Sequence, residues 1–151
     1  MAFEIIWEPL GIYKRFWGFV SIPELIESVA GPRGDPRFDS LRYVIYDFLA
    51  VHAHEITDQA IAGIAAVSIG GHASNPNVRV ALLTTDNAIK DLAWQFASLT
   101  LASYPIQIFQ QPADARAWLQ SKPRPGKLNS LLHRPYPARD EGLPALDELS
   151  S

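Results

Sequence analysis

Residues 41–49 read LRYVIYDFL, and this run is the clearest sign of architecture in the 151-residue chain. Aliphatic and aromatic side chains fill it almost without interruption, and Asp47 is its one acidic residue. A nearly continuous apolar run predicts a strand that is covered on both faces, as strands in parallel sheets are. We therefore expect residues 41–49 to form a central strand of an α/β domain.

Upstream of this strand the sequence predicts a hairpin and one short helix. Apolar and polar side chains alternate in residues 3–8 and again in residues 12–20, with the turn residues Pro9–Gly11 between the two runs. This pattern predicts an antiparallel pair of strands. Ser21 is expected to cap the helix that follows, and residues 33–40 are expected to form a loop rich in Gly, Pro and Asp.

Downstream of the central strand, helical and strand patterns alternate. Thr57 is expected to begin a helix whose apolar residues recur at helical spacing and which Gly70-Gly71 ends. A buried strand is expected over residues 78–84, and Asp86 is expected to cap the helix after it. The last two predicted elements are a strand over residues 104–109 and a helix opened by Pro112.

The order of these elements predicts the fold class. Strands that alternate with helices of this length pair in parallel through right-handed crossovers. We expect an α/β fold with a mixed five-stranded sheet, which opens with an antiparallel hairpin and is flanked by about four helices. Hydrophobic residues make up 48% of the chain, which suits a domain that buries its own core. We place that domain at residues 1–121.

The composition changes after residue 121. Residues 122–151 hold five of the twelve prolines, and basic side chains in residues 122–139 give way to acidic ones in residues 140–151. We expect a Pro-rich C-terminal tail, which is either solvated or docked through its apolar residues on a neighbouring surface.

Composition disfavours several classes of function. The chain has no cysteine, which excludes disulfides, thiolate nucleophiles and cysteine-bound metals. A net charge of −3 disfavours nucleic acid as a partner, and no apolar run reaches the roughly 18 residues of a membrane span. Residues 1–7 lack the basic start of a signal peptide, so we expect a cytoplasmic protein.

No arrangement of reactive residues indicates an enzyme, and we expect no catalytic residue and no cofactor. The sequence has neither a glycine-rich phosphate loop nor a nucleophile elbow, and no carboxylate pair is fixed by helical spacing. His52 and His54 would point the same way from an extended segment. A third ligand at a defined spacing is missing, so no metal site is expected either.

Polar side chains after two of the predicted strands offer a binding surface. Ligands of open α/β sheets bind near the carboxyl ends of parallel strands. Thr57 and Asp58 also fit a simpler role, because they can cap a helix and complement its dipole. The candidate residues of the binding surface are His52, His54, Asp58, Thr85 and Asp86, and Thr57 is a candidate for phosphorylation.

The element order and local motifs resemble the SpoIIAA-like family, a bacterial branch of the STAS (anti-sigma factor antagonist) fold. The resemblance covers about residues 3–120. The matching segments are Gly11–Gly18, Phe38–Phe48, Ser74–Ala81, Tyr104–Ile106 and Ala113–Leu119.

This resemblance implies a STAS-like domain that is not an enzyme and that acts by binding other proteins. In such domains a partner kinase phosphorylates a serine at the start of the helix after the central strand. The matching segment here is Glu55–Asp58, in which Thr57 is the nearest hydroxyl and the Asp-Ser-Ser-Gly pattern of the antagonists is missing. The branch is also similar to lipid-binding CRAL-TRIO folds, which is compatible with an apolar ligand between sheet and helices.

Two functions are open at this point. The first is a non-enzymatic module that binds a protein partner or a small ligand at the rim of residues 48–58 and the starts of the following helices. The alternative is a carrier of an apolar or lipid-like ligand in a pocket lined by aromatic residues such as Trp17, Trp94 and Phe96. Core positions are the simpler expectation for all four tryptophans. Exposed sheet edges and apolar tail residues also favour a homodimer.

Overall fold

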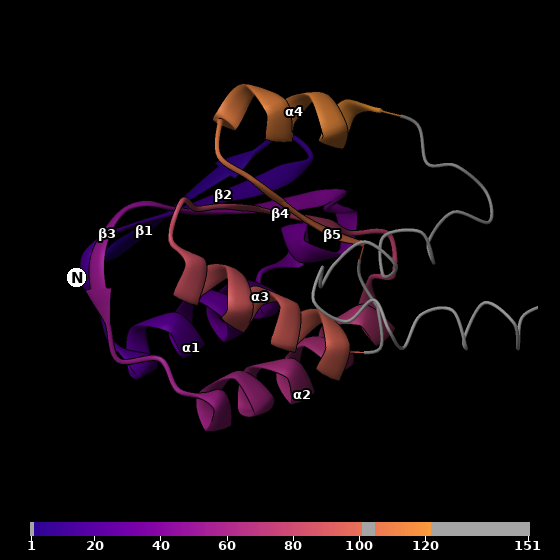
Figure 1. Cartoon of the computed structure of the whole chain (residues 1–151). Helices are drawn as coiled ribbons and strands as arrows, with labels where there is room; N and C mark the ends of the chain where they lie inside the picture. Colours follow the sequence, from indigo (N-terminus) through magenta and orange to yellow (C-terminus); the bar gives the residue numbers. More distant parts are fainter. Residues whose placement is uncertain (1, 101–104, 122–151) are drawn as a thin grey trace, which may run out of the picture. The chain divides into compact units, whose positions relative to one another are not determined.

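A computed structural model describes residues 2–100 and 105–121 of the chain (Figure 1). The predicted tail, residues 122–151, and Tyr104 at the predicted start of the last strand lie outside these residues. In chain order the elements are β1 (Phe3–Glu8), β2 (Gly11–Val20), α1 (Ile22–Ala30), the 3-10 helices η1 (Gly31–Gly34) and η2 (Pro36–Ser40), β3 (Tyr43–His54), α2 (Asp58–Ser74), β4 (Arg79–Leu83), α3 (Asn87–Leu99), β5 (Ile106–Phe109) and α4 (Pro112–Gln120).

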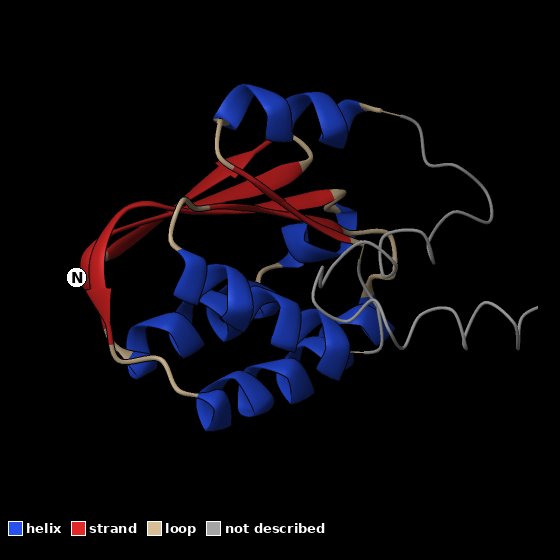
Figure 2. Ribbon diagram, in the orientation of Figure 1, coloured by secondary structure: helices blue, strands red, loops and turns tan. Residues whose placement is uncertain are grey.

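The strands form one five-stranded sheet in the order β1-β2-β3-β4-β5, so each strand pairs with its neighbours in the sequence. β1 and β2 pair antiparallel, and the other pairs are parallel. Because parallel crossovers share one handedness, α1, α2 and α3 all lie on one face, whereas α4 covers the other (Figures 1 and 2). The predicted α/β class, the mixed five-stranded sheet and the opening hairpin are therefore confirmed.

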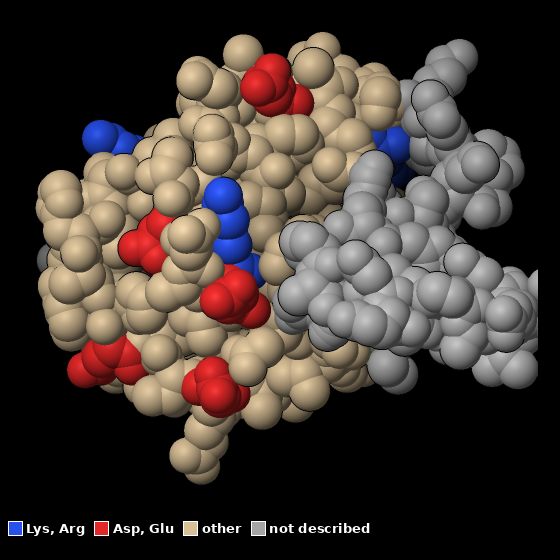
Figure 3. All heavy atoms as spheres, viewed as in Figure 1, with Lys and Arg blue, Asp and Glu red and all other residues tan. Residues whose placement is uncertain are grey.

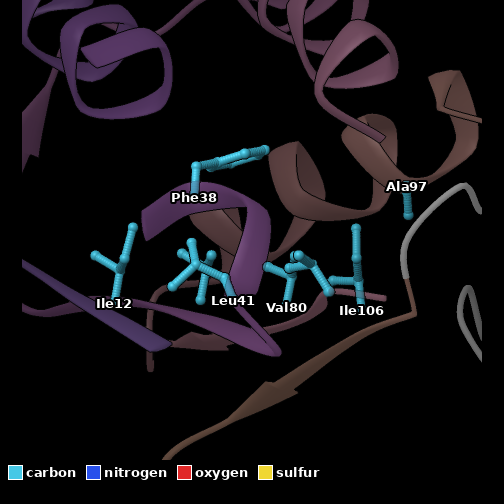
Figure 4. Close-up of a cluster of buried hydrophobic side chains, with 8 residues drawn as sticks. Ile12, Phe38, Leu41, Val80, Ala97 and Ile106 are labelled. Carbon is cyan, nitrogen blue, oxygen red and sulfur yellow. The ribbon is translucent and has the colours of Figure 1, made fainter. Parts of the chain in front are cut away.

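The larger core lies between the sheet and the helices α1, α2 and α3. Phe16 is fully buried and stacks on Phe3 and Phe48, with ring centroids 5.6 and 4.6 Å away. Every second residue of β2 points to this face, which explains the alternating pattern of that strand. A second group of apolar side chains packs beside η2 and α3 (Figure 4). Its members include Ile12, Phe38, Leu41, Val80, Ala97 and Ile106.

A smaller core joins α4 to the opposite face of the sheet. Ala115 is fully buried against apolar side chains of β3 and β4. The ring of Trp118 packs on that of Phe109, with their centroids 5.9 Å apart. The guanidinium of Arg79 donates to the carbonyl of Trp118 (2.6 Å), which ties the end of α4 to β4.

An ion pair connects α4 to the end of β1. Arg116 donates two hydrogen bonds to the carboxylate of Glu8, with Nη1–Oε1 at 2.6 Å and Nη2–Oε2 at 2.7 Å. The hydroxyl of Tyr43 also donates to Glu8, and the Tyr43 ring lies over Gly11, where any Cβ atom would overlap it. The bonds from Arg116 hold the pKa of Glu8 below its ordinary value, and burial raises the pKa of Tyr43.

We expect Arg116→Met to lower the free energy of unfolding by about 1 kcal/mol near neutral pH, since both partners are partly exposed. The pKa of Glu8 is depressed in the folded state. The contribution of the pair is therefore complete above the unfolded pKa near 4.5 and is lost as the pH falls through the folded value. Urea unfolding of the wild type and Arg116→Met at about pH 7 and about pH 3 measures the difference in their free energies of unfolding. A difference that is as large at about pH 3 as at about pH 7 would contradict a contribution from the ion pair.

The N-caps predicted from the sequence are present. The hydroxyl of Ser21 accepts the N–H of Glu24, whose carboxylate accepts the N–H of Ser21 in return. Thr57 and Asp86 likewise accept backbone N–H groups in the first turns of α2 and α3. These side chains satisfy donors that a helix start leaves unpaired, which fixes where each helix begins.

The predicted loop over residues 33–40 is wrong, because this segment is built from the 3-10 helices η1 and η2. The carboxylate of Asp35 caps η2 by accepting a backbone N–H (2.8 Å). The buried amide of Asn75 donates to the carbonyls of Phe38 (2.8 Å) and Leu41 (3.0 Å). These tertiary hydrogen bonds order a segment whose Gly and Pro content indicates only turns.

The central strand is longer than the predicted segment 41–49. β3 continues to His54, because its second half still pairs with β2, where Val20 lies opposite His54. His52 and His54 therefore belong to a strand and not to the loop after it.

The predicted helix end at Gly70 and Gly71 is also wrong, because α2 continues to Ser74. A Cβ atom on Gly70 would lie 3.2 Å from the guanidinium of Arg33. Arg33 also donates to the carbonyl of Val67 in α2 (2.5 Å). Gly70 thus makes room for an arginine that lies against the helix.

One tryptophan differs from the expected core position. Trp7, Trp94 and Trp118 are partly buried against the apolar clusters, but Trp17 is 37% exposed. Trp17 lies on the opposite face of β2 from Phe16, and α4 packs mainly on β4 and β5. The helix therefore leaves this part of the sheet uncovered.

Candidate functional site

The predicted binding-surface residues of β3 lie where this strand extends past its neighbour. β3 pairs with β4 only as far as Asp47, opposite Leu83, and beyond that point it pairs with β2 alone. His52 is exposed and His54 is half-buried on this extension. At a rise of about 3.3 Å per residue, His52 lies roughly 16 Å farther along β3 than Asp47.

Side chains of the β3–α2 connection bond its own backbone and that of α1. The Nδ1 atom of His54 accepts the N–H two residues further on (3.1 Å), and the carboxylate of Glu55 accepts the first N–H of α1 (2.9 Å). The hydroxyl of Thr57 accepts an N–H in the first turn of α2 (3.1 Å). Thr57 and Asp58 are both exposed, so the connection is locally ordered while its outer side chains face solvent.

Thr85 and Asp86 lie in the connection from β4 to α3, and both are exposed. The carboxylate of Asp86 accepts two N–H groups of α3, at 2.7 and 3.2 Å. The buried hydroxyl of Thr84 accepts the N–H of Asp86 (3.0 Å). Because β4 ends level with Asp47, the strand register separates this connection from the histidines of β3. The candidate residues therefore form two groups and not one.

Some ionisable side chains of the described residues are engaged in pairs, and others face solvent. Within residues 2–100 and 105–121, no three His, Asp or Glu side chains gather closely enough to hold a metal ion. The hydroxyl of Tyr13 donates to Asp47, and burial together with this bond raises the pKa of Tyr13. This hydrogen bond joins β2 to β3 on the face that carries α4.

Thr57→Val is expected to lower the free energy of unfolding by about 1 kcal/mol, because it removes the N-cap of α2. Thr57→Asn should stay within a few tenths of a kcal/mol of the wild type, since asparagine is a good N-cap. Urea unfolding of the three proteins tests this prediction. Equal stability of the valine and asparagine variants would show that the cap contributes nothing.

A cavity lies between the sheet and the helices α1, α2 and α3. Its volume is about 70 Å³, and its walls are almost entirely apolar. All three helices and the strands β3, β4 and β5 contribute side chains, including Leu25, Ile64 and Phe96. Of the aromatic residues predicted to line such a pocket, Phe96 does so, but Trp17 and Trp94 do not line this cavity.

A second cavity, of about 50 Å³, shares wall residues with the first, among them Tyr46 and Phe96. Lys14, Arg33 and Ser68 also line it. Lys14 is only 3% exposed, and its Nζ atom donates to the hydroxyl of Tyr46 (3.2 Å) and lies 4.6 Å from the ring centroid. Burial lowers the pKa of Lys14 from its usual 10.5 to about 7. The second cavity thus lies beside the first and has a more polar wall.

Lys14 is not among the site residues predicted from the sequence, although its position in β2 carries a signal. Lys14 falls in phase with Ile12 and Phe16, on the face of β2 that alternation assigns to the core. Lysine is almost never fully buried without a partner. A lysine on the core-facing side of a strand therefore indicates a position with a special role.

Charged side chains are interspersed on the face of the described domain that Figure 3 shows, and lysines and arginines do not gather there into one basic patch. None of the helices in the described part of the chain is long and apolar enough to cross a membrane.

Comparison with known proteins identifies the fold. No family model and no curated protein matches the sequence. Among solved structures, the unphosphorylated anti-sigma factor antagonist SpoIIAA matches with a TM-score of 0.52 and 10% identity, over 80% of this chain and 100% of its own. An uncharacterised protein with a SpoIIAA-like fold from Shewanella loihica PV-4 matches with a TM-score of 0.50 and 12% identity, over 78% of this chain and 92% of its own. The chain therefore has the SpoIIAA-like fold that the sequence motifs indicated.

Proposed function

We propose that this chain, with its SpoIIAA-like fold, is a non-catalytic interaction module that binds a protein partner through the rim of residues 48–58. The observation that carries the proposal is the match to a solved structure named as an anti-sigma factor antagonist, over 80% of the present chain. The rim supports it, because β3 extends past β4 and presents exposed polar side chains. Local hydrogen bonds from His54 and Glu55 hold this surface in a defined shape, which favours specific recognition.

Site-specific photocrosslinking tests the rim. A benzophenone amino acid replaces His52 or Asp58, which are exposed and make no capping bond, and in a matched control it replaces Asp91 on the exposed side of α3. We expect the same crosslinked partner from both rim positions and none from Asp91. A partner that crosslinks equally from Asp91, or only from there, would remove the rim from consideration.

Phosphorylation of Thr57 is the regulatory part of the proposal. Its exposed hydroxyl lies at the start of α2, where a phosphate would meet the positive end of the helix dipole and the carboxylate of Asp58. Thr57→Ser keeps both the cap and the phosphate acceptor, whereas Thr57→Asn keeps the cap alone. Mass spectrometry of the protein from its source cells should find a phosphopeptide in the wild type and the serine variant only. A phosphopeptide in the asparagine variant would assign the site elsewhere.

A second function, the carriage of a small apolar ligand, is favoured by one specific observation. The core between the sheet and α1, α2 and α3 contains an apolar cavity of about 70 Å³. Well-packed cores rarely leave voids larger than a water molecule, so a cavity of this size is a candidate for a ligand. Native mass spectrometry of freshly purified protein should detect a bound apolar molecule in the wild type. Its absence in repeated preparations would count against this function.

A further inference from the structure

We propose that the two adjoining cavities form one internal site for a small apolar carboxylic acid. The carboxylate would lie at Lys14 and Arg33, and the hydrocarbon body would fill the apolar cavity under α1, α2 and α3. This inference rests on the carrier function proposed above and names the chemical class of its ligand.

Lys14 is the main reason for this assignment. Its side chain lies inside the fold, at 3% exposure, with the hydroxyl of Tyr46 as its hydrogen-bond partner. None of the ion pairs among the described residues includes Lys14, so no carboxylate of this part of the chain balances its charge. The titratable side chains that line the cavity with it are Tyr46 and Arg33, and no Asp or Glu of the described residues lines it. A ligand carboxylate would supply the opposite charge that a buried ammonium requires.

Arg33 gives the site a second donor of the same sign. It is half-buried, lines the cavity with Lys14, and likewise takes part in no ion pair with a described carboxylate. Its hydrogen bond to the carbonyl of Val67 holds the guanidinium against α2, and the missing side chain of Gly70 leaves room for it there. A guanidinium has five N–H donors, so Arg33 can bind a carboxylate and keep its bond to the helix.

The two cavities also define the shape and size of the ligand. One is apolar and the other has cationic side chains in its wall, so a molecule that spans both must be amphipathic. Their volumes are about 70 and 50 Å³. A dry cavity of about 150 Å³ accepts benzene, and this site is smaller, so it suits a short acid of about four carbons and not a long-chain lipid.

Calorimetric titration with butanoate and with 1-butanol tests the proposal. Both ligands have four carbons, but only butanoate has a charge for Lys14. We expect butanoate to bind the wild type at least roughly tenfold more tightly than butanol. Lys14→Met should abolish this preference and leave butanol binding intact. The matched control is Arg15→Met, which removes a charge from the next residue on the exposed face and should keep the preference.

Each outcome separates the site from the carrier function. Equal binding of butanoate and butanol to the wild type, or a preference that survives Lys14→Met, would overturn the role of Lys14 while the carrier function stands. If neither ligand binds the wild type, both proposals fall. Nuclear Overhauser contacts from the butanoate methyl group to Phe96 and Ile64 are expected, and their absence from a bound complex would place the ligand outside the cavity.

Discussion

Lys14→Met is expected to stabilise the folded protein by about 2–4 kcal/mol near neutral pH, although it removes a hydrogen bond to Tyr46. Burial lowers the pKa of Lys14 from 10.5 to about 7, so the folded state holds the charged amine less well than the unfolded chain does. Each pKa unit corresponds to about 1.4 kcal/mol, and the lost hydrogen bond offsets part of the gain. Methionine fills a similar volume without a charge.

The stabilisation should depend on pH in a direction that the depressed pKa fixes. Below about pH 7 both states carry the protonated lysine, and the full cost of burying the charge is present. Between about pH 7 and 10.5 the unfolded chain binds more protons than the folded protein, so wild-type stability rises with pH. The advantage of Lys14→Met should therefore shrink as the pH rises through this window.

Urea unfolding of wild type and Lys14→Met at about pH 7 and about pH 9.5 measures the effect. The comparison between the two proteins cancels the titration of other groups, and Arg15→Met serves as the control for the loss of a nearby exposed charge. A methionine variant that is less stable than the wild type at neutral pH would show that Lys14 is not held as an unpaired buried charge.

The second large effect is expected at Asn75, where Asn75→Ala should cost about 3 kcal/mol. The side chain is 2% exposed, and its amide donates to the carbonyls of Phe38 and Leu41. Its carbonyl oxygen accepts the N–H of Asn77 (3.1 Å). Alanine leaves all three backbone groups without this partner, and unsatisfied buried groups are expensive.

The midpoint of urea unfolding measures the loss at Asn75. Asn77→Ala is the matched control, since Asn77 is exposed and the N–H that it contributes belongs to the backbone. We expect the control to stay within about 0.5 kcal/mol of the wild type. Equal losses in the two variants would mean that the amide bonds to residues 38 and 41 do not hold η2 in place.

The sequence predicted the parts of the fold that depend on local pattern. Alternation in residues 3–20 gave the hairpin, and the apolar run from Leu41 gave the central strand, because burial of one or both faces is recorded in the spacing of apolar side chains. Thr57 and Asp86 were recognised as caps, since a hydroxyl or carboxylate at a helix start acts on the next turn alone.

The parts that the sequence did not predict depend on contacts between distant residues. Gly70 has the composition of a helix end but accommodates Arg33, which lies 37 residues earlier in the chain. The turns of η2 depend on Asn75 in the same way. The cavities depend on how completely side chains from three helices and four strands fill a shared space, and no spacing of residues encodes that.

The candidate surface was predicted only as a set of residues. Thr57, Thr85 and Asp86 follow parallel strands, as the sequence predicted, whereas His52 lies within β3 and not after it. The unequal lengths of β3 and β4 were not foreseen, because pairing of residues 50–54 with β2 alone extends one strand and not the other. The polar residues at the end of β3 and those after β4 were expected in one surface, but they lie at different positions along the strand direction.

The order of strands in the sheet, which repeats their order in the chain, has a consequence for assembly. Each pair of neighbouring strands is joined by a single connection in the chain. During synthesis, each new strand can therefore pair with an edge strand that has already formed. Removing residues from the C-terminal side would take away the edge strand β5 and leave the other four strands paired as before. In a sheet whose last strand in sequence lies at its centre, the same truncation would remove a central strand.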